Sequence, residues 1–157
     1  LRKNGEFYRV SPWALTWDDE NYYLIAYDSE EQMVKHFRVD KMVKVHIIEE
    51  SRDGKEVFDT FDITAYVKKN FGMFGGDEQD VKLRVNEKSI GVVLDHFGKD
   101  IMVVPVDDQH CNVNLKVALS DQFLGWVFAL GDDVEILGPE DVRVRLKEMA
   151  TKIAERY

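Results

Sequence analysis

The stretch YYLIAYDSEEQMVKHFRVDKM, residues 22–42, decides the fold of the first half of the chain. Two runs of apolar, aromatic and β-branched residues flank an acidic segment, which is the pattern of two β-strands joined by a turn. In the first run, alternation places Tyr22 and Leu24 on one face of the strand and Tyr23 and Ile25 on the other. Because neither face is polar, we predict a strand that is covered on both sides.

The sequence on either side of this stretch extends the same pattern. The runs FYRVSPWALTW (7–17) and MVKVHIIEE (42–50) are also rich in aromatic and β-branched residues and are bounded by polar residues or proline. Their spacing suits a small antiparallel sheet or barrel. The segment SRDGKE (51–56) contains an Asp-Gly turn signal, and FDITAYVKKNF (61–71) predicts a short helix.

The second half of the chain alternates strand and helix patterns. The segment FGMFGGDEQD (71–80) interrupts the sequence with three glycines and an acidic patch, and we place the domain boundary there. Beyond it, apolar spacing predicts strands over 81–85, 101–106, 112–119 and 133–137, and helices over 88–98 and 120–131. The resulting order, βαββαβ, is the ferredoxin-like arrangement of four strands backed by two helices.

A further helix is predicted over the last residues of the chain. Pro139 suits the first turn of a helix, and two acidic residues follow it. One apolar stripe runs along this helix and faces either the sheet or a partner; it consists of Val142, Leu146, Met149, Ile153 and Tyr157.

Composition excludes several classes of protein. The 157 residues are 45% hydrophobic and 32% charged, which is ordinary for a globular chain that forms one domain or two small ones. The negative charge is spread over both halves, so neither carries the basic field that duplex DNA binding usually requires. No apolar run reaches the roughly 18 residues of a membrane span, and the first ten residues lack the apolar core of a signal peptide. The single cysteine, Cys111, excludes an internal disulfide and fits a reducing cytoplasm, where we expect the protein to be.

Patterns typical of enzymes and metal sites are missing from the sequence. The four histidines, at positions 36, 46, 96 and 110, show no HxxH or HExxH spacing. The glycines of FGMFGG are not followed by Lys-Ser or Lys-Thr, so this segment is not a phosphate-binding loop and reads as a hinge or close-packed turn. We therefore predict no enzyme activity, no catalytic residue, no metal and no cofactor.

Several motifs resemble those of the WYL domain. The stretch YRVSPWALTWDDENYYLIAYD (8–28), followed by FRVDKM (37–42), is similar to the family pattern of a Ser-Pro turn, an aromatic-Tyr-Leu triplet and a basic strand end. In this chain Tyr22 replaces the leading Trp of the triplet and Lys41 replaces the closing arginine, whereas Arg38 is unchanged. The later motifs FGMFGG, DHFGKD, FLGWVFALGDDVEILGPEDV and ERY resemble the C-terminal extension found in many bacterial WYL regulators.

The resemblance implies an α+β protein with two domains. We expect an Sm-like, SH3-type β-barrel over residues 1–66, a linker over 67–80 and a ferredoxin-like extension with a C-terminal helix over 81–157. It also implies the effector-sensing and oligomerisation region of a bacterial transcriptional regulator. Such regulators usually begin with a winged helix-turn-helix, through which the full-length protein would contact duplex DNA. Because this sequence lacks that module and an initiator Met, we expect it to be a fragment of a longer protein.

The resemblance also suggests a ligand site in the barrel. Aromatic faces stack on bases and guanidinium groups fork onto phosphate oxygens, so we expect an anionic effector such as a nucleotide or single-stranded nucleic acid. An alternative is a solvated strand end whose cations pair with Glu30, Glu31 and Asp40, an arrangement that contributes under about 1 kcal/mol. In a straight strand Lys35 and Arg38 also point to opposite faces, so they converge only if the chain bends at RVDK. The candidate ligand-binding residues are Ser11, Tyr22, Tyr23, Lys35, Arg38 and Lys41.

A second hypothesis makes the chain a structural module without a small ligand. Phe123, Trp126 and Phe128 within one predicted helix exceed what a single apolar face needs. This aromatic surface either packs against the last helix or forms part of an interface. In the second case the ferredoxin-like half would mediate a homodimer, the assembly that we expect of an operator-binding regulator.

Overall fold

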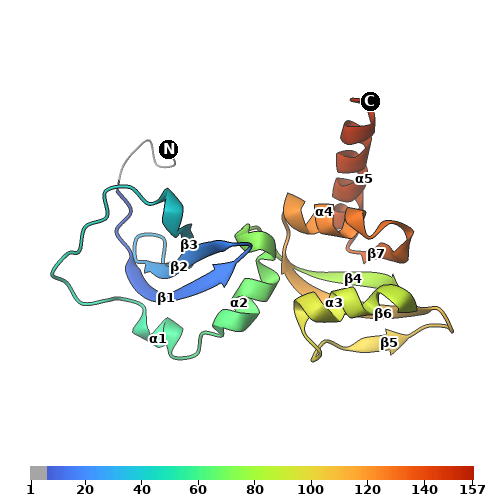
Figure 1. The fold of residues 1–157 in the computed structure, drawn as a ribbon. Coiled ribbons are helices and arrows are strands. Elements are labelled where there is room, and N and C mark those ends of the chain that lie inside the picture. Colours follow the sequence, from blue (N-terminus) through green and yellow to red (C-terminus); the bar gives the residue numbers. More distant parts are fainter. Residues whose placement is uncertain (1–6) are drawn as a thin grey trace. The chain divides into compact units, whose positions relative to one another are not determined.

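The computed structural model describes residues 7–157 of the chain (Figure 1). The chain divides into two compact units, residues 1–63 and residues 64–157. Each unit contains one antiparallel sheet, of three strands in the N-terminal unit and four in the C-terminal unit. Within the described residues, no helix has both the length and the apolar character needed to cross a membrane. The α+β class predicted from the sequence is confirmed.

The N-terminal sheet is a meander of three consecutive strands. Strands β1 (Ser11–Asp18), β2 (Asn21–Asp28) and β3 (Met33–Arg38) lie in the order β1-β2-β3. Asp19 and Glu20 form the two-residue turn between β1 and β2, with φ angles of 43° and 60°. Both residues are in the left-handed region, which gives the turn a twist that matches the flanking strands. The strand pair predicted from residues 22–42 is therefore confirmed, but the expected cover on both faces of β2 is incomplete, since Tyr22 is 56% exposed.

The expected barrel is not closed in the part of the N-terminal unit that the structure describes. A 3₁₀ turn, η2 (Val39–Lys41), ends β3, and residues 42–50, predicted as a further strand, form none. The backbone of Lys44 has a φ of 58°, which interrupts an extended conformation. Ile47 is 98% exposed, so this β-branched run finds no neighbouring strand on which to pack.

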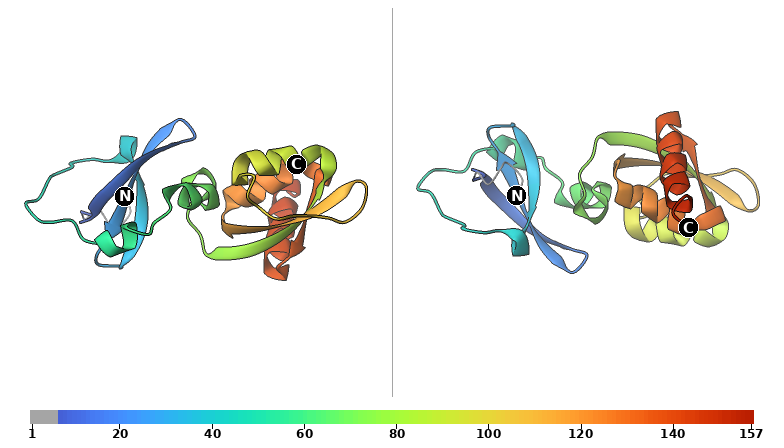
Figure 2. Two further views of the ribbon diagram at one scale, coloured as in Figure 1. Left: turned by 90° about the horizontal axis from the view of Figure 1, so that it is seen from below. Right: turned by 90° about the horizontal axis from the view of Figure 1, so that it is seen from above.

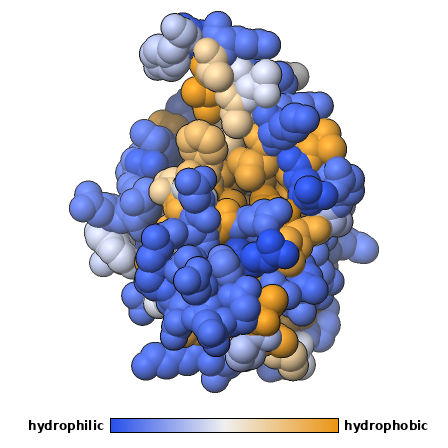
Figure 3. Space-filling model, turned by 90° about the vertical axis from the view of Figure 1, so that its right-hand side faces the viewer, coloured by the Kyte–Doolittle hydropathy of each residue, from blue (hydrophilic) through white to orange (hydrophobic). Residues whose placement is uncertain are grey.

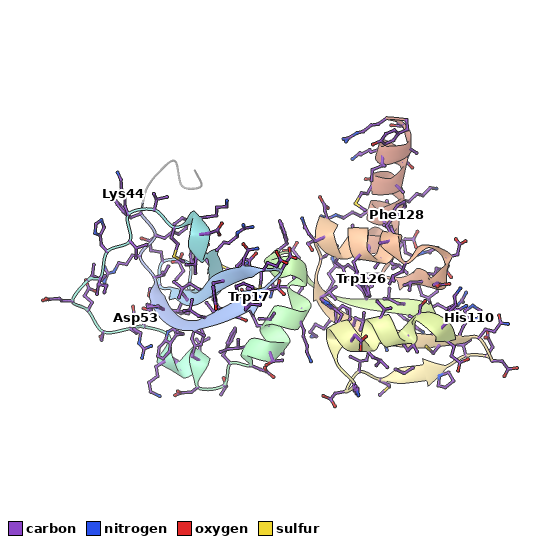
Figure 4. All side chains as sticks on the ribbon, viewed as in Figure 1. Trp17, Lys44, Asp53, His110, Trp126 and Phe128 are labelled. Carbon is purple, nitrogen blue, oxygen red and sulfur yellow. The ribbon has the colours of Figure 1, made fainter. Side chains whose placement is uncertain are left out.

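The chain returns to the start of β1 after this irregular segment. Asp53 is labelled in Figure 4. Its backbone N–H donates to the hydroxyl of Ser11, and its carbonyl accepts from the indole N–H of Trp13, both at 2.8 Å. Gly54, with a φ of 80°, precedes the short helix α1 (Lys55–Phe58). The ring of Phe58 stacks on Trp13 with 5.1 Å between centroids. These contacts secure residues 53–58 against β1.

The division between the units falls at the first residue of helix α2 (Ile63–Lys69), which a turn, η3 (Phe71–Met73), follows. The elements that follow are β4 (Glu78–Asn86), η4 (Glu87–Ser89), α3 (Ile90–Phe97), β5 (Val103–Pro105), β6 (His110–Ala118), α4 (Asp121–Ala129), η5 (Gly131–Asp133) and β7 (Val134–Gly138). The strands lie in the order β5-β6-β4-β7 and all neighbouring pairs are antiparallel. The predicted βαββαβ order is confirmed.

One face of this sheet forms the core of the unit. Alternate residues of β4 and β6 are buried, and the residues between them on β4 are exposed and polar. Helix α5 (Glu140–Ala154), the red helix of Figure 2, follows β7. It adds the fully buried Val142 to the same core. The buried core consists of Val81, Leu83, Val85, Val93, Cys111, Val113, Leu115, Val117, Leu119, Phe123, Leu124, Val127, Val134, Ile136 and Val142.

Helix α5 packs against the core through its first three turns, and its last turn does not. Leu146 and Met149 are partly buried against the core, whereas Ile153 and Tyr157 are exposed. The first part of the predicted apolar stripe therefore faces the helix's own unit, and its end remains on the surface.

Candidate functional site

A compact charged cluster lies where β3 ends. The guanidinium of Arg38 forks onto the carboxylate of Asp40, with Nε–Oδ1 and Nη2–Oδ2 distances of 2.8 and 3.1 Å. The ammonium of Lys41 lies 3.5 Å from the same carboxylate. The side chains of Arg38 and Lys41 are 40% and 70% exposed. Two accessible cations thus share one carboxylate, and the cluster carries a net positive charge within an acidic chain.

Tyr23 connects this cluster to the sheet. It lies opposite Arg38 in the register of β2 and β3, so the two side chains share one face. Tyr23 is 7% exposed, and its ring contacts the imidazole of His36 at 6.2 Å between centroids. The hydrogen bond with Asp40 raises the pKa of Arg38, and Tyr23 contributes further to this shift. In turn, the hydrogen bond from Arg38 lowers the pKa of Asp40.

Lys35 belongs to a separate ion-pair network. Its ammonium lies 2.7 Å from the carboxylates of both Asp28 and Glu31. The buried carboxylate of Asp28 also accepts hydrogen bonds from the backbone N–H groups of Glu30 and Glu31. Burial acts to raise the pKa of Asp28, but the hydrogen bonds from Lys35 and the backbone outweigh it, and the pKa is lowered. Lys35 therefore supports the turn between β2 and β3.

The structure also separates Tyr22 and Ser11 from Arg38. Tyr22 lies on the opposite face of β2 and makes an edge contact with Trp17, with 4.7 Å between ring centroids. The hydroxyl of Ser11 is engaged with the backbone of Asp53. Of the six candidate residues, the structure brings together Tyr23, Arg38 and Lys41.

Two residues of this region were not among the sequence candidates. Asp40 was expected only as one of the acids that pair with the cations in the alternative of a solvated strand end, and its contacts with Arg38 and Lys41 agree with that alternative. Trp17 lies directly opposite Tyr22 in the register of β1 and β2, a pairing that follows from the two-residue turn once its length is known.

The structure contains no other obvious chemical centre in the part of the chain that it describes. Among residues 7–157, no group of three or more His, Cys, Asp or Glu side chains could hold a metal ion. Cys111 is buried, its thiol faces the carbonyl of Val85 at 3.7 Å, and burial raises its pKa. This thiol is held in its neutral form in the core.

Comparison with known proteins identifies both units. The family model of the WYL domain matches residues 2–47, and that of the WCX domain matches residues 77–154. A search of curated proteins found no match.

Two solved structures are similar to the chain. A crystal structure of a CRISPR Cas-related protein is 16% identical, with a TM-score of 0.53, over 93% of this chain and 42% of the other. Proteasome accessory factor B/C (PafBC) of Arthrobacter aurescens is 19% identical, with a TM-score of 0.41, over 87% of this chain and 20% of the other. The chain thus spans less than half the length of either protein. Together with the motifs around Arg38, the matched models show that the chain belongs to the WYL-domain proteins, with a WYL domain followed by a WCX domain.

Proposed function

We propose that this chain is the effector-sensing region of a WYL-domain transcriptional regulator and that its WYL unit binds an anionic ligand at Arg38, Lys41 and Tyr23. The observation that supports the proposal is the exposure of both cations, which have only one carboxylate between them and so carry a net positive charge; the pairing of Arg38 with Asp40 is by itself what the alternative of a solvated strand end predicts. An incoming phosphate could replace Asp40 as the partner of the guanidinium fork, because both groups offer two oxygens in a similar geometry.

The neighbouring ring supports the position of Arg38. Tyr23 is largely buried and lies beside Arg38 on the same face of the sheet, so its ring restricts the movement of the Arg38 side chain. Because Tyr23 is only 7% exposed, a nucleotide or a single strand would be held mainly through the contacts of its phosphates with the two cations. These two chemistries remain the proposed ligand classes.

Arg38→Ala is expected to weaken binding of a fluorescent single-stranded oligonucleotide or a cyclic dinucleotide at least tenfold, because it removes a charge-assisted fork. Arg38→Lys should restore only part of the affinity, since an ammonium is a point charge. Asp40→Asn should strengthen binding, because it removes the carboxylate that competes with the ligand. Fluorescence anisotropy at fixed ionic strength measures all three effects.

The matched control is Arg84→Ala in the WCX unit. Arg84 is 45% exposed and pairs with a single carboxylate, Glu135, at 3.1 Å. The control variant has the same charge change as Arg38→Ala, so loss of affinity in both variants would reveal a general electrostatic effect. Equal affinity of the parent and Arg38→Ala proteins would contradict the proposed site.

A second candidate function is homodimerisation through the WCX unit. Phe128 on α4 and Val144 on α5 are exposed, and apolar side chains gather near the middle of the face of this unit shown in Figure 3. Exposed aromatic residues are enriched at protein interfaces. This candidate is compatible with ligand sensing in the other unit, and by itself it would make the chain a structural module.

Phe128→Glu is expected to convert a dimer of the parent chain into a monomer of 18.3 kDa, because it places a carboxylate within an apolar contact. Light scattering over a range of concentrations measures the mass. Val92→Glu on α3 is the matched control, since Val92 is also exposed in the same unit. A parent chain that is monomeric at every concentration would contradict the dimer.

A further inference from the structure

Helix α2 is fastened to α3 of the WCX unit by a histidine. The imidazole of His96 forms a hydrogen bond with the backbone of Lys68. The same ring contacts Phe97 and Trp126, with 4.7 and 6.0 Å between centroids, and both of these side chains pack against the WCX core. Burial lowers the pKa of His96, so the ring is neutral at pH 7. One polar contact thus connects α2 with the packed side chains of this unit.

The two lysines at the end of α2 add further contacts with the same unit. The ammonium of Lys68 lies close to Gly98, since a Cβ atom on this glycine would lie 2.6 Å from it. Gly98 caps the carboxyl end of α3, where the partial negative charge of the helix favours a cation. Lys69 pairs with the carboxylate of Glu78 in β4, which also pairs with Lys116 of β6 at 3.4 Å. Helix α2 is therefore held by both α3 and β4.

The glycine-containing segment that follows α2, residues 70–77, is packed against the same unit. Asn70 and Met73 are each 5% exposed. The side-chain amide of Asn70 donates to a backbone carbonyl of α2, and the backbone N–H of Met73 donates to the carbonyl of Asn70, both at 2.7 Å. The backbone of Gly76 approaches Leu119 so closely that no Cβ atom would fit between them. Of the hinge and the close-packed turn expected from the sequence, these contacts favour the turn.

Residues 52–61, by contrast, are held by the WYL sheet. The ring of Trp13 in β1 contacts the guanidinium of Arg52 at 4.3 Å and the ring of Phe58 at 5.1 Å. Phe61 follows Phe58, with 4.8 Å between their rings, and its backbone N–H donates to the carbonyl of Phe58 at 3.3 Å. Contacts with the WYL unit therefore extend to Phe61, and helix α2, with its contacts to the WCX unit, begins two residues later.

We propose that α2 and residues 70–77 form a rigid arm of the WCX unit and that the joint between the two units is the chain from Phe61 to Ile63. We call α2 with residues 70–77 the WCX arm. A bend at the joint would break none of the contacts described above. A bend within residues 74–76 would instead separate α2 from α3 and β4, and so break the contacts of His96 and Glu78. The proposed joint precedes the linker that the sequence suggested over residues 67–80.

Nuclear magnetic resonance of the full chain tests where the joint lies. Residual dipolar couplings of backbone N–H groups report the orientation of each element within a common alignment tensor. We expect two tensors, one for the strands of each sheet. The couplings of the WCX arm should fit the tensor of the WCX sheet, and those of residues 53–58 should fit the tensor of the WYL sheet. Couplings of α2 that do not fit the WCX tensor, or a single tensor for the whole chain, would overturn the proposal.

Two variants test the contacts that hold the WCX arm. His96→Ala removes the hydrogen bond with Lys68, and Glu78→Gln removes the charge that pairs with Lys69. Hydrogen exchange of the α2 amides should become at least about tenfold faster in His96→Ala and about threefold faster in Glu78→Gln. The amides of β6 should keep exchange rates within about twofold of the parent, because the core of the sheet is unchanged.

His110→Ala is the matched control, since His110 begins β6 in the same unit and pairs with Asp107. This variant should leave the exchange of α2 within about twofold of the parent. Glu78 is 42% exposed, so Glu78→Gln supplies the measurement if His96→Ala fails to fold. Exchange of α2 at the parent rate in Glu78→Gln, or an equal acceleration in His110→Ala, would show that these contacts do not hold the arm.

Discussion

Gly76→Ala is expected to destabilise the WCX unit strongly. A Cβ atom at this position would lie 2.0 Å from the carbonyl oxygen of Leu119 and 2.8 Å from its carbonyl carbon. The obstacle is backbone, and the N–H of Leu119 is bonded to the carbonyl of Asp77 at 2.9 Å, so neither segment can move away freely. We expect a cost at the upper end of the roughly 1–3 kcal/mol that overpacking usually causes.

Hydrogen exchange of the backbone amides of β6 measures this effect within the WCX unit. Gly125→Ala in α4 is the matched control, because nothing lies within 4 Å of its Cβ position. In a helix this control should stabilise the unit by up to about 1 kcal/mol. Similar protection factors in Gly76→Ala and the parent would contradict the close approach at Leu119.

Asp28→Asn is expected to destabilise the WYL unit by roughly 1.5–3 kcal/mol at neutral pH. This is the usual contribution of a hydrogen bond with a charged group to the free energy of unfolding. The carboxylate is buried and accepts from Lys35 and two backbone N–H groups. Asparagine keeps one acceptor but loses the charge that Lys35 requires. Unfolding in urea, followed by tryptophan fluorescence, measures the difference.

The same residue predicts a pH dependence. The pKa of Asp28 is lowered in the folded protein. Its contribution to the free energy of unfolding is therefore fully present at pH values above the unfolded pKa of about 3.9. That contribution is lost as the pH falls through the folded pKa, and the difference between parent and Asp28→Asn should shrink there. Asp59→Asn is the control, because the Lys55–Asp59 pair is exposed. A pH-independent difference for Asp28→Asn would contradict the charged network.

Periodicity was sufficient to predict the WCX unit because its strands and helices differ clearly in apolar spacing. Alternate burial along β4 and β6 follows directly from their sequences. The same reasoning failed for residues 42–50, where β-branched residues are present but no strand forms. Residue type shows that a segment can pair; it does not show that a neighbouring strand is available.

The candidate site was predicted in part. Alternation correctly separated Tyr22 from Tyr23, and it correctly warned that Lys35 and Arg38 point apart in a straight strand. The positions of Asp40 and Lys41 depend on the 3₁₀ turn after Arg38, which the sequence indicated only as a required bend. The ion pairs of Lys35 depend on the fold of the acidic turn, so side-chain partners could not be assigned from spacing alone.

The two-sided use of β2 has an evolutionary consequence. Neighbouring residues Tyr22 and Tyr23 serve opposite faces, so inserting or deleting one residue between them and the strand end would exchange the faces of every residue beyond that point. Descendants of this chain should therefore change the length of β2 only in steps of two residues, or compensate with a bulge such as the one between Pro12 and Ala14 in β1. Single-residue insertions and deletions should instead accumulate in the irregular segment of residues 42–54. This segment pairs with no strand, so a change of one residue does not move side chains from one face of a sheet to the other.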